Sequence, residues 1–146
     1  MQSTSFPNGL PFMKMHGLGN DFVVIDERAT GSVVDAAIAR AIGDRHRGVG
    51  FDQLAVIRHS AQADVELVFW NANGSTAGAC GNATRCIAAY EMCKTGTGTL
   101  TLRTERGVLF ARDLGDGITS VNMGPPLLDW RDVQLAYEMD LSLIHI

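Results

Sequence analysis

The segment NANGSTAGACGNATRC, residues 71–86, holds the residue types whose spacing best supports chemistry. A polar, glycine-containing loop ends at Cys80, directly before Gly81 and Asn82 at the expected start of a helix. Unpaired N–H groups and the positive end of the helix dipole favour the thiolate form of a cysteine at that position. The same N–H groups can bind a carboxylate. The segment therefore predicts a base or nucleophile beside an anion-binding site.

Two other interpretations of these residues stay open. Asparagine and glycine are preferred in turns, so Asn71 and Asn73 also fit a turn that binds no ligand. A thiol-dependent hydrolase would need a histidine beside Cys80, and the sequence leaves His16 and His46 available for that role. Neither histidine has an identifiable partner in the sequence, which is more typical of surface residues.

The other two cysteines are Cys86 and Cys93. By helical spacing they share one stripe with Ala83, Ile87 and Tyr90, so we expect both thiols to face the core as small hydrophobic groups. Three clustered cysteines without a CxxC pair favour reduced thiols in a cytoplasmic protein. The same spacing predicts no structural zinc site.

Hydrophobic periodicity predicts a strand-rich α+β domain with two helices. The first helix is expected at 33–43, where Ser32 and Asp35 fit a capping box. The second is expected to run from about Asn82 to Gly96, a residue type that commonly ends helices. Strands are expected at 21–27, 54–59, 65–70, 99–104, 108–113 and 118–123. Hairpin signals join the last three, so this part of the sheet is expected to be mostly antiparallel.

Composition argues against several classes of partner. The 146 residues carry a formal net charge of −4, which gives no electrostatic footprint for nucleic acid. No apolar run approaches the roughly 20 residues that cross a bilayer. Residues 1–12 lack the features of a secretory signal and are expected to form a flexible extension. The glycine loops HGLGND and GVGFDQ match neither GxGxxG nor GxxxxGK[ST], so no nucleotide site is predicted.

Four blocks of sequence carry a resemblance to a known family: MKMHGLGNDFVVID (13–26), GVGFDQL (48–54), WNANGSTAGACGNATRC (70–86) and VNMGPP (121–126). Together they resemble the amino-terminal half of diaminopimelate epimerase, in the family's order and at its usual separations. Residues 13–130 are then expected to form the amino-terminal epimerase domain, and 131–146 an inter-domain segment or a foreign tail. Ala83 and Thr84 depart from the family's usual Gly-Ala pair, but both are compatible with a helix.

The resemblance implies a cofactor-independent epimerase that interconverts LL- and meso-2,6-diaminopimelate in lysine biosynthesis. Two cysteines on opposite sides of the substrate α-carbon would exchange the proton, and Cys80 matches the cysteine of the first half. Substrate contacts are implied at five positions, namely Asn20, Gln53, Asn71, Gly81 and Asn82. No metal or other cofactor is implied. A homodimer is one assembly open to the full-length protein.

The implied fold is α+β, a curled and mostly antiparallel sheet around a central helix in each of two similar domains. The second domain, with its own Cys-Gly-Thr segment, is not among these 146 residues, so the chain alone is expected to be inactive or nearly so. Two alternatives stay open. One is another isomerase of the same fold, of the proline-racemase or phenazine-biosynthesis type. The other is a non-catalytic binding module.

Overall fold

The computed structural model describes residues 9–125 and 129–132. Within these ranges the chain forms eight strands and two helices. In chain order they are β1 (Met13–Gly17), β2 (Asn20–Asp26), α1 (Ala36–Gly43), β3 (Gln53–Arg58), β4 (Val65–Asn71), β5 (Thr76–Ala77), α2 (Gly81–Thr95), β6 (Thr99–Thr104), β7 (Gly107–Asp113) and β8 (Thr119–Asn122).

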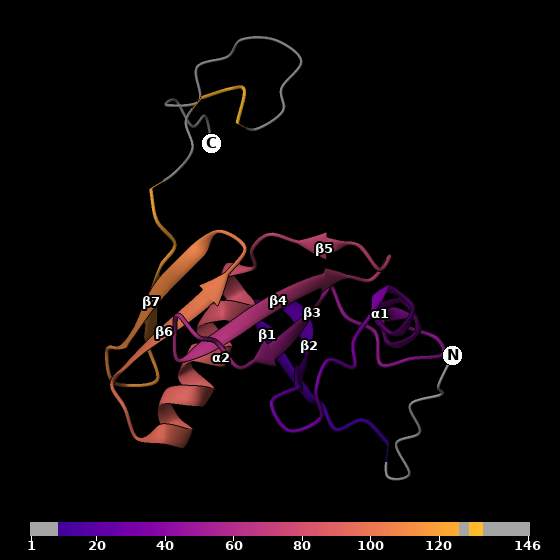
Figure 1. The fold of residues 1–146 in the computed structure, drawn as a ribbon, viewed down its shortest axis with the longest axis horizontal. Helices are drawn as coiled ribbons and strands as arrows, with labels where there is room; N and C mark the ends of the chain where they lie inside the picture. The colour runs from indigo at the N-terminus through magenta and orange to yellow at the C-terminus, as the bar shows by residue number, and fades with distance from the viewer. Residues whose placement is uncertain (1–8, 126–128, 133–146) are drawn as a thin grey trace.

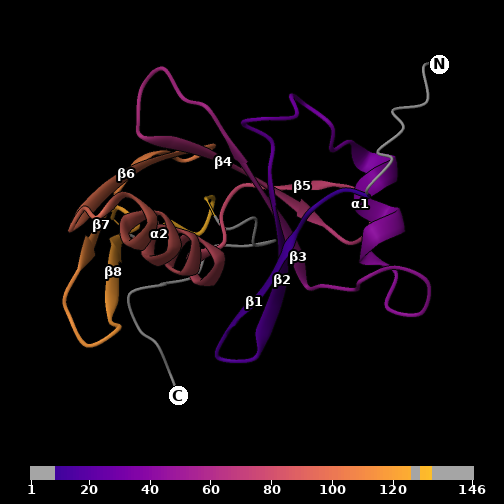
Figure 2. The same cartoon turned by 90° about the horizontal axis from the view of Figure 1, so that it is seen from below.

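A single mixed sheet contains all eight strands, in the order β1-β2-β3-β4-β6-β7-β8, with β5 paired to β4. The β2–β3 and β4–β6 pairs are parallel, and the other five pairs are antiparallel. The sheet curls, so that β1–β3 and β6–β8 lie on different sides of α2 (Figures 1 and 2). The predicted fold class, an α+β domain with a curled, mostly antiparallel sheet around a central helix, is confirmed.

Strand β2 is buried on both faces, which explains its uninterrupted apolar run. Successive side chains of a strand point to opposite faces. Phe22 and Val24 belong to the core that α2 completes with Ile87, whereas Val23 and Ile25 belong to a second core on the α1 side of the sheet. All four strand side chains are at most 1% exposed. The central helix and α1 therefore cover opposite faces of the same strand.

Helix α1 begins three residues later than predicted. Asp35 is the N-cap residue itself, and its carboxylate accepts the N–H groups of Ala37 and Ile38. The predicted capping box between Ser32 and Asp35 is therefore wrong. The physical reason lies upstream, where the buried Glu27 carboxylate accepts the N–H groups of residues 33 and 34 and holds them outside the helix.

Helix α2 has the predicted limits, but its buried face differs from the predicted stripe. Gly96 ends the helix with φ of 70°, in the left-handed region, and donates its N–H to the Met92 carbonyl. The face turned to the core comprises Ala83, Thr84, Ile87, Ala88, Glu91 and Met92. Cys93 is exposed, so the expectation that it faces the core is wrong. The pattern failed because Glu91, a charged residue, occupies a core-facing position through its ion pair with Arg28.

The predicted strands are all present, and the structure adds β1 and β5. Strand β1 pairs with β2 through a tight turn at Leu18-Gly19, both with positive φ. Most of the expected extension at 1–12 and of the expected tail at 131–146 lies outside the described residues. Among the residues that are described, no helix is both long and apolar enough to span a membrane.

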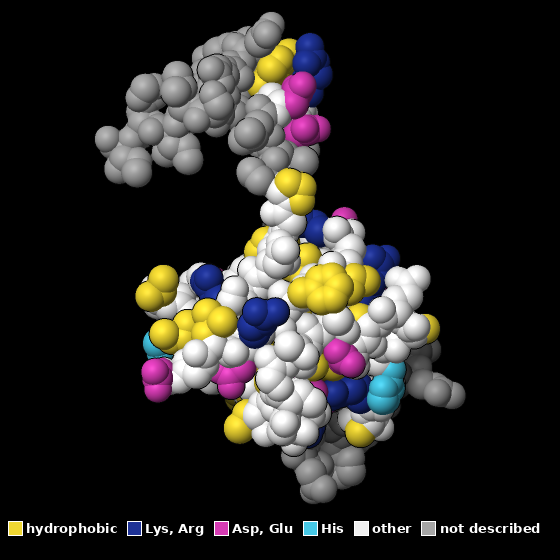
Figure 3. Space-filling model, turned by 90° about the vertical axis from the view of Figure 1, so that its left-hand side faces the viewer, with side chains coloured by type: hydrophobic (Ala, Val, Ile, Leu, Met, Phe, Trp, Pro, Cys, Tyr) yellow, Lys and Arg dark blue, Asp and Glu magenta, His cyan; other side chains and the backbone are white. Residues whose placement is uncertain are grey.

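The outer face of the β6–β8 region carries hydrophobic side chains between charged ones. Figure 3 shows the side of the molecule on which these strands lie. The exposed large hydrophobic residues in this part of the chain are Val108, Phe110, Leu114 and Ile118, of which Phe110 is 63% exposed. Scattered apolar side chains of this kind are ordinary on protein surfaces.

Candidate active site

Cys80 lies at the first turn of α2, as the N-cap residue of the helix. Its sulfur accepts the N–H of Ala83 at 3.4 Å, and its carbonyl oxygen accepts the N–H of Thr84 at 2.9 Å. The Thr84 hydroxyl donates to the same carbonyl at 2.8 Å. Cys80 is 8% exposed, at the end of the core that α2 shares with the sheet. The sequence thus places this thiol correctly, while its catalytic role stays a prediction.

Asn20 is the predicted site residue that meets Cys80 directly. The turn at Leu18-Gly19 delivers it to the first position of β2, opposite Gly17 of β1. Its side-chain oxygen lies 3.9 Å from the Cys80 sulfur, the distance of a weak S–H···O hydrogen bond. Two residues far apart in the sequence are therefore brought together where the sheet meets the helix start.

Gly81 and Asn82 are the first two residues of α2, and their N–H groups have no intrahelical acceptor. A Cβ built at Gly81 meets no atom within 4 Å, so its backbone is open on that side. The Asn82 side-chain oxygen accepts from Arg85 at 2.5 Å. A Cβ on Gly17 would lie only 3.0 Å from the Asn82 Cβ. Glycine at position 17 therefore lets β1 approach the helix start.

Gln53 and Asn71 lie opposite each other at one end of the neighbouring strands β3 and β4. Gln53 begins β3 and lies opposite Phe22 of β2 on one side and Asn71 of β4 on the other. Asn71 also closes a turn, because its side chain donates to the Ser75 hydroxyl at 3.0 Å and its N–H to the Ser75 carbonyl at 2.8 Å. Within 9–125 and 129–132, neither Gln53 nor Asn71 hydrogen-bonds to the Cys80 sulfur.

A charged cluster beside Asn20 was missed by the sequence reasoning. Asp52 accepts from the Asn20 side-chain amide at 3.2 Å, and Arg45 donates to both Asp52, at 2.9 Å, and Asp21, at 2.6 Å. The Arg45 guanidinium, followed by the Lys14 ammonium, holds the pKa of the Asp21 carboxyl well below its usual range. The only available signal in the sequence was the position of Asp52 directly before Gln53.

Cys86 is half-buried and packs against the core, in partial agreement with its predicted position. Its thiol donates to the His16 carbonyl oxygen at 3.7 Å. Burial raises the pKa of the Cys86 thiol, and the Arg85 charge opposes this effect only in part. Burial therefore favours the protonated form of the Cys86 thiol.

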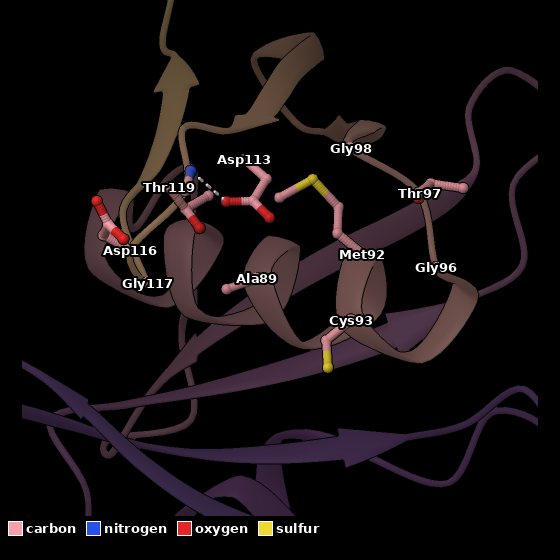
Figure 4. Close-up of a pocket in the computed structure, with 11 residues that line it drawn as sticks. Ala89, Met92, Cys93, Gly96, Thr97, Gly98, Asp113, Asp116, Gly117 and Thr119 are labelled. Atoms are coloured by element: carbon pink, nitrogen blue, oxygen red, sulfur yellow. Dashed lines mark hydrogen bonds between the residues drawn. The ribbon is translucent and has the colours of Figure 1, made fainter.

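The cavity shown in Figure 4 lies at the C-terminal end of α2, whereas Cys80 is the N-cap residue of that helix. It has a volume of about 510 Å³ and is lined by the end of the helix and by the β7–β8 connection. Met92 points toward Asp113 in this view, and Cys93 points away (Figure 4). None of the predicted site residues lines it. In the described part of the chain, no three His, Cys, Asp or Glu residues are grouped to hold a metal ion.

Solved structures of similar architecture define the fold class of this chain. A hydroxyproline epimerase from Agrobacterium vitis matches with a TM-score of 0.56 and 14% identity over 77% of this chain and 40% of that chain. A phenazine biosynthesis protein of the PhzF family from Bacillus anthracis matches with a TM-score of 0.53 and 20% identity over 77% and 38%. At these identities the similarity establishes the fold and nothing more.

Sequence comparison identifies the family within this class. The chain belongs to the diaminopimelate epimerase family, whose model matches residues 12–128. It is 50% identical over 134 residues to the diaminopimelate epimerase of Acidiphilium cryptum, covering 91% of this chain and 48% of the relative. The Phenylobacterium zucineum relative is 43% identical over 138 residues, with 94% and 50% covered. The chain thus spans about half the length of these relatives, and the resemblance noted in its four sequence blocks is confirmed.

Proposed function

We propose that this chain supplies the amino-terminal half of a cofactor-independent diaminopimelate epimerase, with Cys80 as one of its two acid/base cysteines. The observation that carries the proposal is the position of the Cys80 sulfur at the first turn of α2, where it accepts the Ala83 N–H. The substrate is inferred from family membership and from the 50% identity with the Acidiphilium cryptum enzyme.

The difficult step is removal of an α-proton from an amino acid without a conjugated ring to accept the electron pair. The reaction is reversible: in one direction a Cys80 thiolate takes the α-proton and the electron pair moves from the C–H bond toward the carboxylate, and in the other direction the Cys80 thiol donates the proton. The free N–H groups of Gly81 and Asn82 donate to that carboxylate and stabilise its added negative charge. A second cysteine, outside these 146 residues, returns a proton to the opposite face of the carbon.

The remaining predicted contacts belong to the same proposal. Asn20 contacts Cys80, and Gln53 and Asn71 lie opposite each other at one end of β3 and β4, which supports a role for the three side chains in holding the substrate. Residues 13–130 are proposed as the amino-terminal epimerase domain, in line with the family match over 12–128. A cytoplasmic location, a homodimer of the full-length protein, and 131–146 as an inter-domain segment or foreign tail stay predictions.

The proposal is tested in a chimera in which residues 13–130 replace the matching half of the Acidiphilium cryptum relative. Conversion of LL-diaminopimelate to the meso isomer is followed in D₂O, together with deuterium incorporation at the α-carbon. Substituting Cys80→Ser should lower the rate by about 10²- to 10⁴-fold, the usual contribution of a positioned acid or base. Cys93→Ser, a matched change on the exposed face of the same helix, should keep the rate within about twofold.

Two further measurements could contradict the proposed mechanism or the proposed substrate. The 146-residue chain alone should give no meso isomer, because a second proton donor is missing; turnover comparable to the chimera would contradict the two-cysteine mechanism. Proline and hydroxyproline serve as alternative substrates for the chimera. If they are epimerised and diaminopimelate is not, the fold is right and the substrate is wrong.

A further inference from the structure

The Asn20 side chain lies between the Cys80 sulfur and the Asp52 carboxylate. Its oxygen faces the sulfur at 3.9 Å, and its nitrogen donates to Asp52 Oδ2 at 3.2 Å. A carboxylate has only acceptor atoms, so it can hydrogen-bond only to the NH₂ end of the amide. Asp52 thus determines that the carbonyl end of Asn20 is the end presented to Cys80.

Asp52 is about half exposed, and further hydrogen bonds hold it in place. Its Oδ2 also accepts the N–H of Asp21 at 3.1 Å, and its own N–H donates to the Asp21 carbonyl at 2.8 Å. Its other oxygen, Oδ1, accepts from Arg45 at 2.9 Å. The backbone and the side chain of Asp52 therefore both hydrogen-bond to the start of β2, whose first residue is Asn20.

The orientation of Asn20 matters because the Cys80 sulfur has two contacts, with Ala83 and with Asn20, that act in opposite directions on the ionisation of the thiol. The Ala83 N–H donates to Cys80 and favours the thiolate. The Asn20 carbonyl oxygen accepts an S–H proton and favours the neutral thiol. If the amide turned over, its NH₂ group would donate to the sulfur instead. One flip of Asn20 would then change the second contact from favouring the thiol to favouring the thiolate.

We propose that Asp52 is a positioning residue that holds the Asn20 carboxamide with its carbonyl oxygen toward Cys80, and so favours the protonated thiol in the resting protein. The catalytic meaning of this device rests on the proposed function: this half of the site would rest as the proton donor. The orientation itself concerns only residues of this chain. It is therefore testable without turnover.

The test measures iodoacetamide alkylation of the 146-residue chain from pH 6 to pH 10, quantified at each cysteine by peptide mass spectrometry. The exposed Cys93 is the internal reference. For Asp52→Ala we expect the pH of half-maximal alkylation at Cys80 to fall by roughly half a unit to one unit, the effect of losing one weak hydrogen bond to the thiol. A mere change in access would scale the rate equally at every pH.

Two controls separate orientation from lost charge. Asp21→Ala removes a carboxylate of the same cluster but leaves the contact between Asp52 and Asn20 in place, so it should shift the Cys80 profile less. In an Asn20→Ala background there is no amide to orient, so Asp52→Ala should cause no additional shift. Equal shifts for the two aspartates, or a shift that persists without Asn20, would overturn the proposal.

A measurement on the unsubstituted chain covers the case in which Asp52→Ala fails to fold. In an NMR spectrum, the side-chain NH₂ signals of Asn20 are identified by their loss in Asn20→Ala. Their chemical shifts should differ from those of free asparagine amides, because one of the two protons is hydrogen-bonded to Asp52. Signals of a freely exposed amide would refute the orientation. Asp52→Asn keeps one acceptor oxygen, so its Cys80 profile should lie between those of the unsubstituted chain and Asp52→Ala. An inactive chimera with the expected alkylation shifts would refute the epimerase and leave the orientation standing.

Discussion

At the scale of single residues, the carboxylate of Glu27 is a buried charge outside the site whose hydrogen bonds we expect to stabilise the fold. It is 3% exposed, accepts the N–H groups of Val33 and Val34 at its Oε1, and pairs with Arg58 at 2.7 Å through its Oε2. Glu27→Ala would leave three donors without their acceptor. We expect it to lower the free energy of unfolding by about 3 kcal/mol, measured by urea denaturation.

A matched substitution tests whether this loss is specific. Glu105→Ala removes a carboxylate from an exposed turn and should change the free energy of unfolding by less than about 0.5 kcal/mol. Equal effects of the two substitutions would mean that the Glu27 contacts contribute no more than surface charge. The same contacts explain why 33 and 34 lie outside α1, a feature that periodicity cannot reveal because the acceptor, Glu27, belongs to the segment that follows β2.

Residue types and spacing predicted part of the candidate site. Cys80 was placed by purely local rules, since a loop followed by a helical pattern fixes a helix start. Asn20 and Asp52 lie 32 positions apart and meet only because β2 and β3 pair in parallel. Strand order and register depend on long-range packing that one sequence does not display. The positioning contact was therefore beyond sequence reasoning, although both of its residues stand in conspicuous motifs.

At the scale of elements, helix α2 begins at the candidate catalytic residue Cys80 and ends at a left-handed glycine cap, Gly96. Gly96 adopts φ of 70°, a region that residues with a Cβ enter at a cost. Gly96→Ala should lower the melting temperature by several degrees, the equivalent of about 1 kcal/mol. Gly98, two positions on, has no positive φ and open space at its Cβ, so Gly98→Ala is the control and should have a smaller effect. Equal losses would show that the left-handed cap is unimportant.

The limits of helices and strands were easier to predict from the sequence than their buried faces and their pairing. The limits of α2 followed from residue preferences at its two ends. Its buried face did not, because the charged Glu91 is buried in an ion pair with Arg28, and a pattern of apolar residues does not include such a position. The apolar run at 21–27 indicated a strand, and the structure adds that two cores cover its two faces. The parallel pairings of β2 with β3 and of β4 with β6 leave no comparable mark in the sequence.

At the scale of the whole molecule, three aspartates tie distant parts of the sheet to their neighbours. Hydrogen bonds from Arg45 lower the pKa of Asp21 at the start of β2, and those from Arg28 lower the pKa of Asp26 at its end. The Thr101 hydroxyl and N–H lower the pKa of Asp64, which joins the segment before β4 to β6. Each carboxylate binds its proton more weakly in the folded chain than in the unfolded one.

This difference fixes the direction of the pH dependence. A carboxylate with a depressed folded-state pKa stabilises the fold fully above its unfolded value of about 3.9, and that stability is lost as pH falls through and below it. Urea unfolding should therefore give similar free energies at pH 7 and pH 5 as far as these groups are concerned, and a lower value near pH 3. Asp26→Asn should reduce stability at pH 7 and flatten the acid loss, because its group no longer titrates. Asp116→Asn, in an exposed turn, should leave the acid loss as it is. An acid loss as steep in Asp26→Asn as in the unsubstituted chain would assign the effect to other groups.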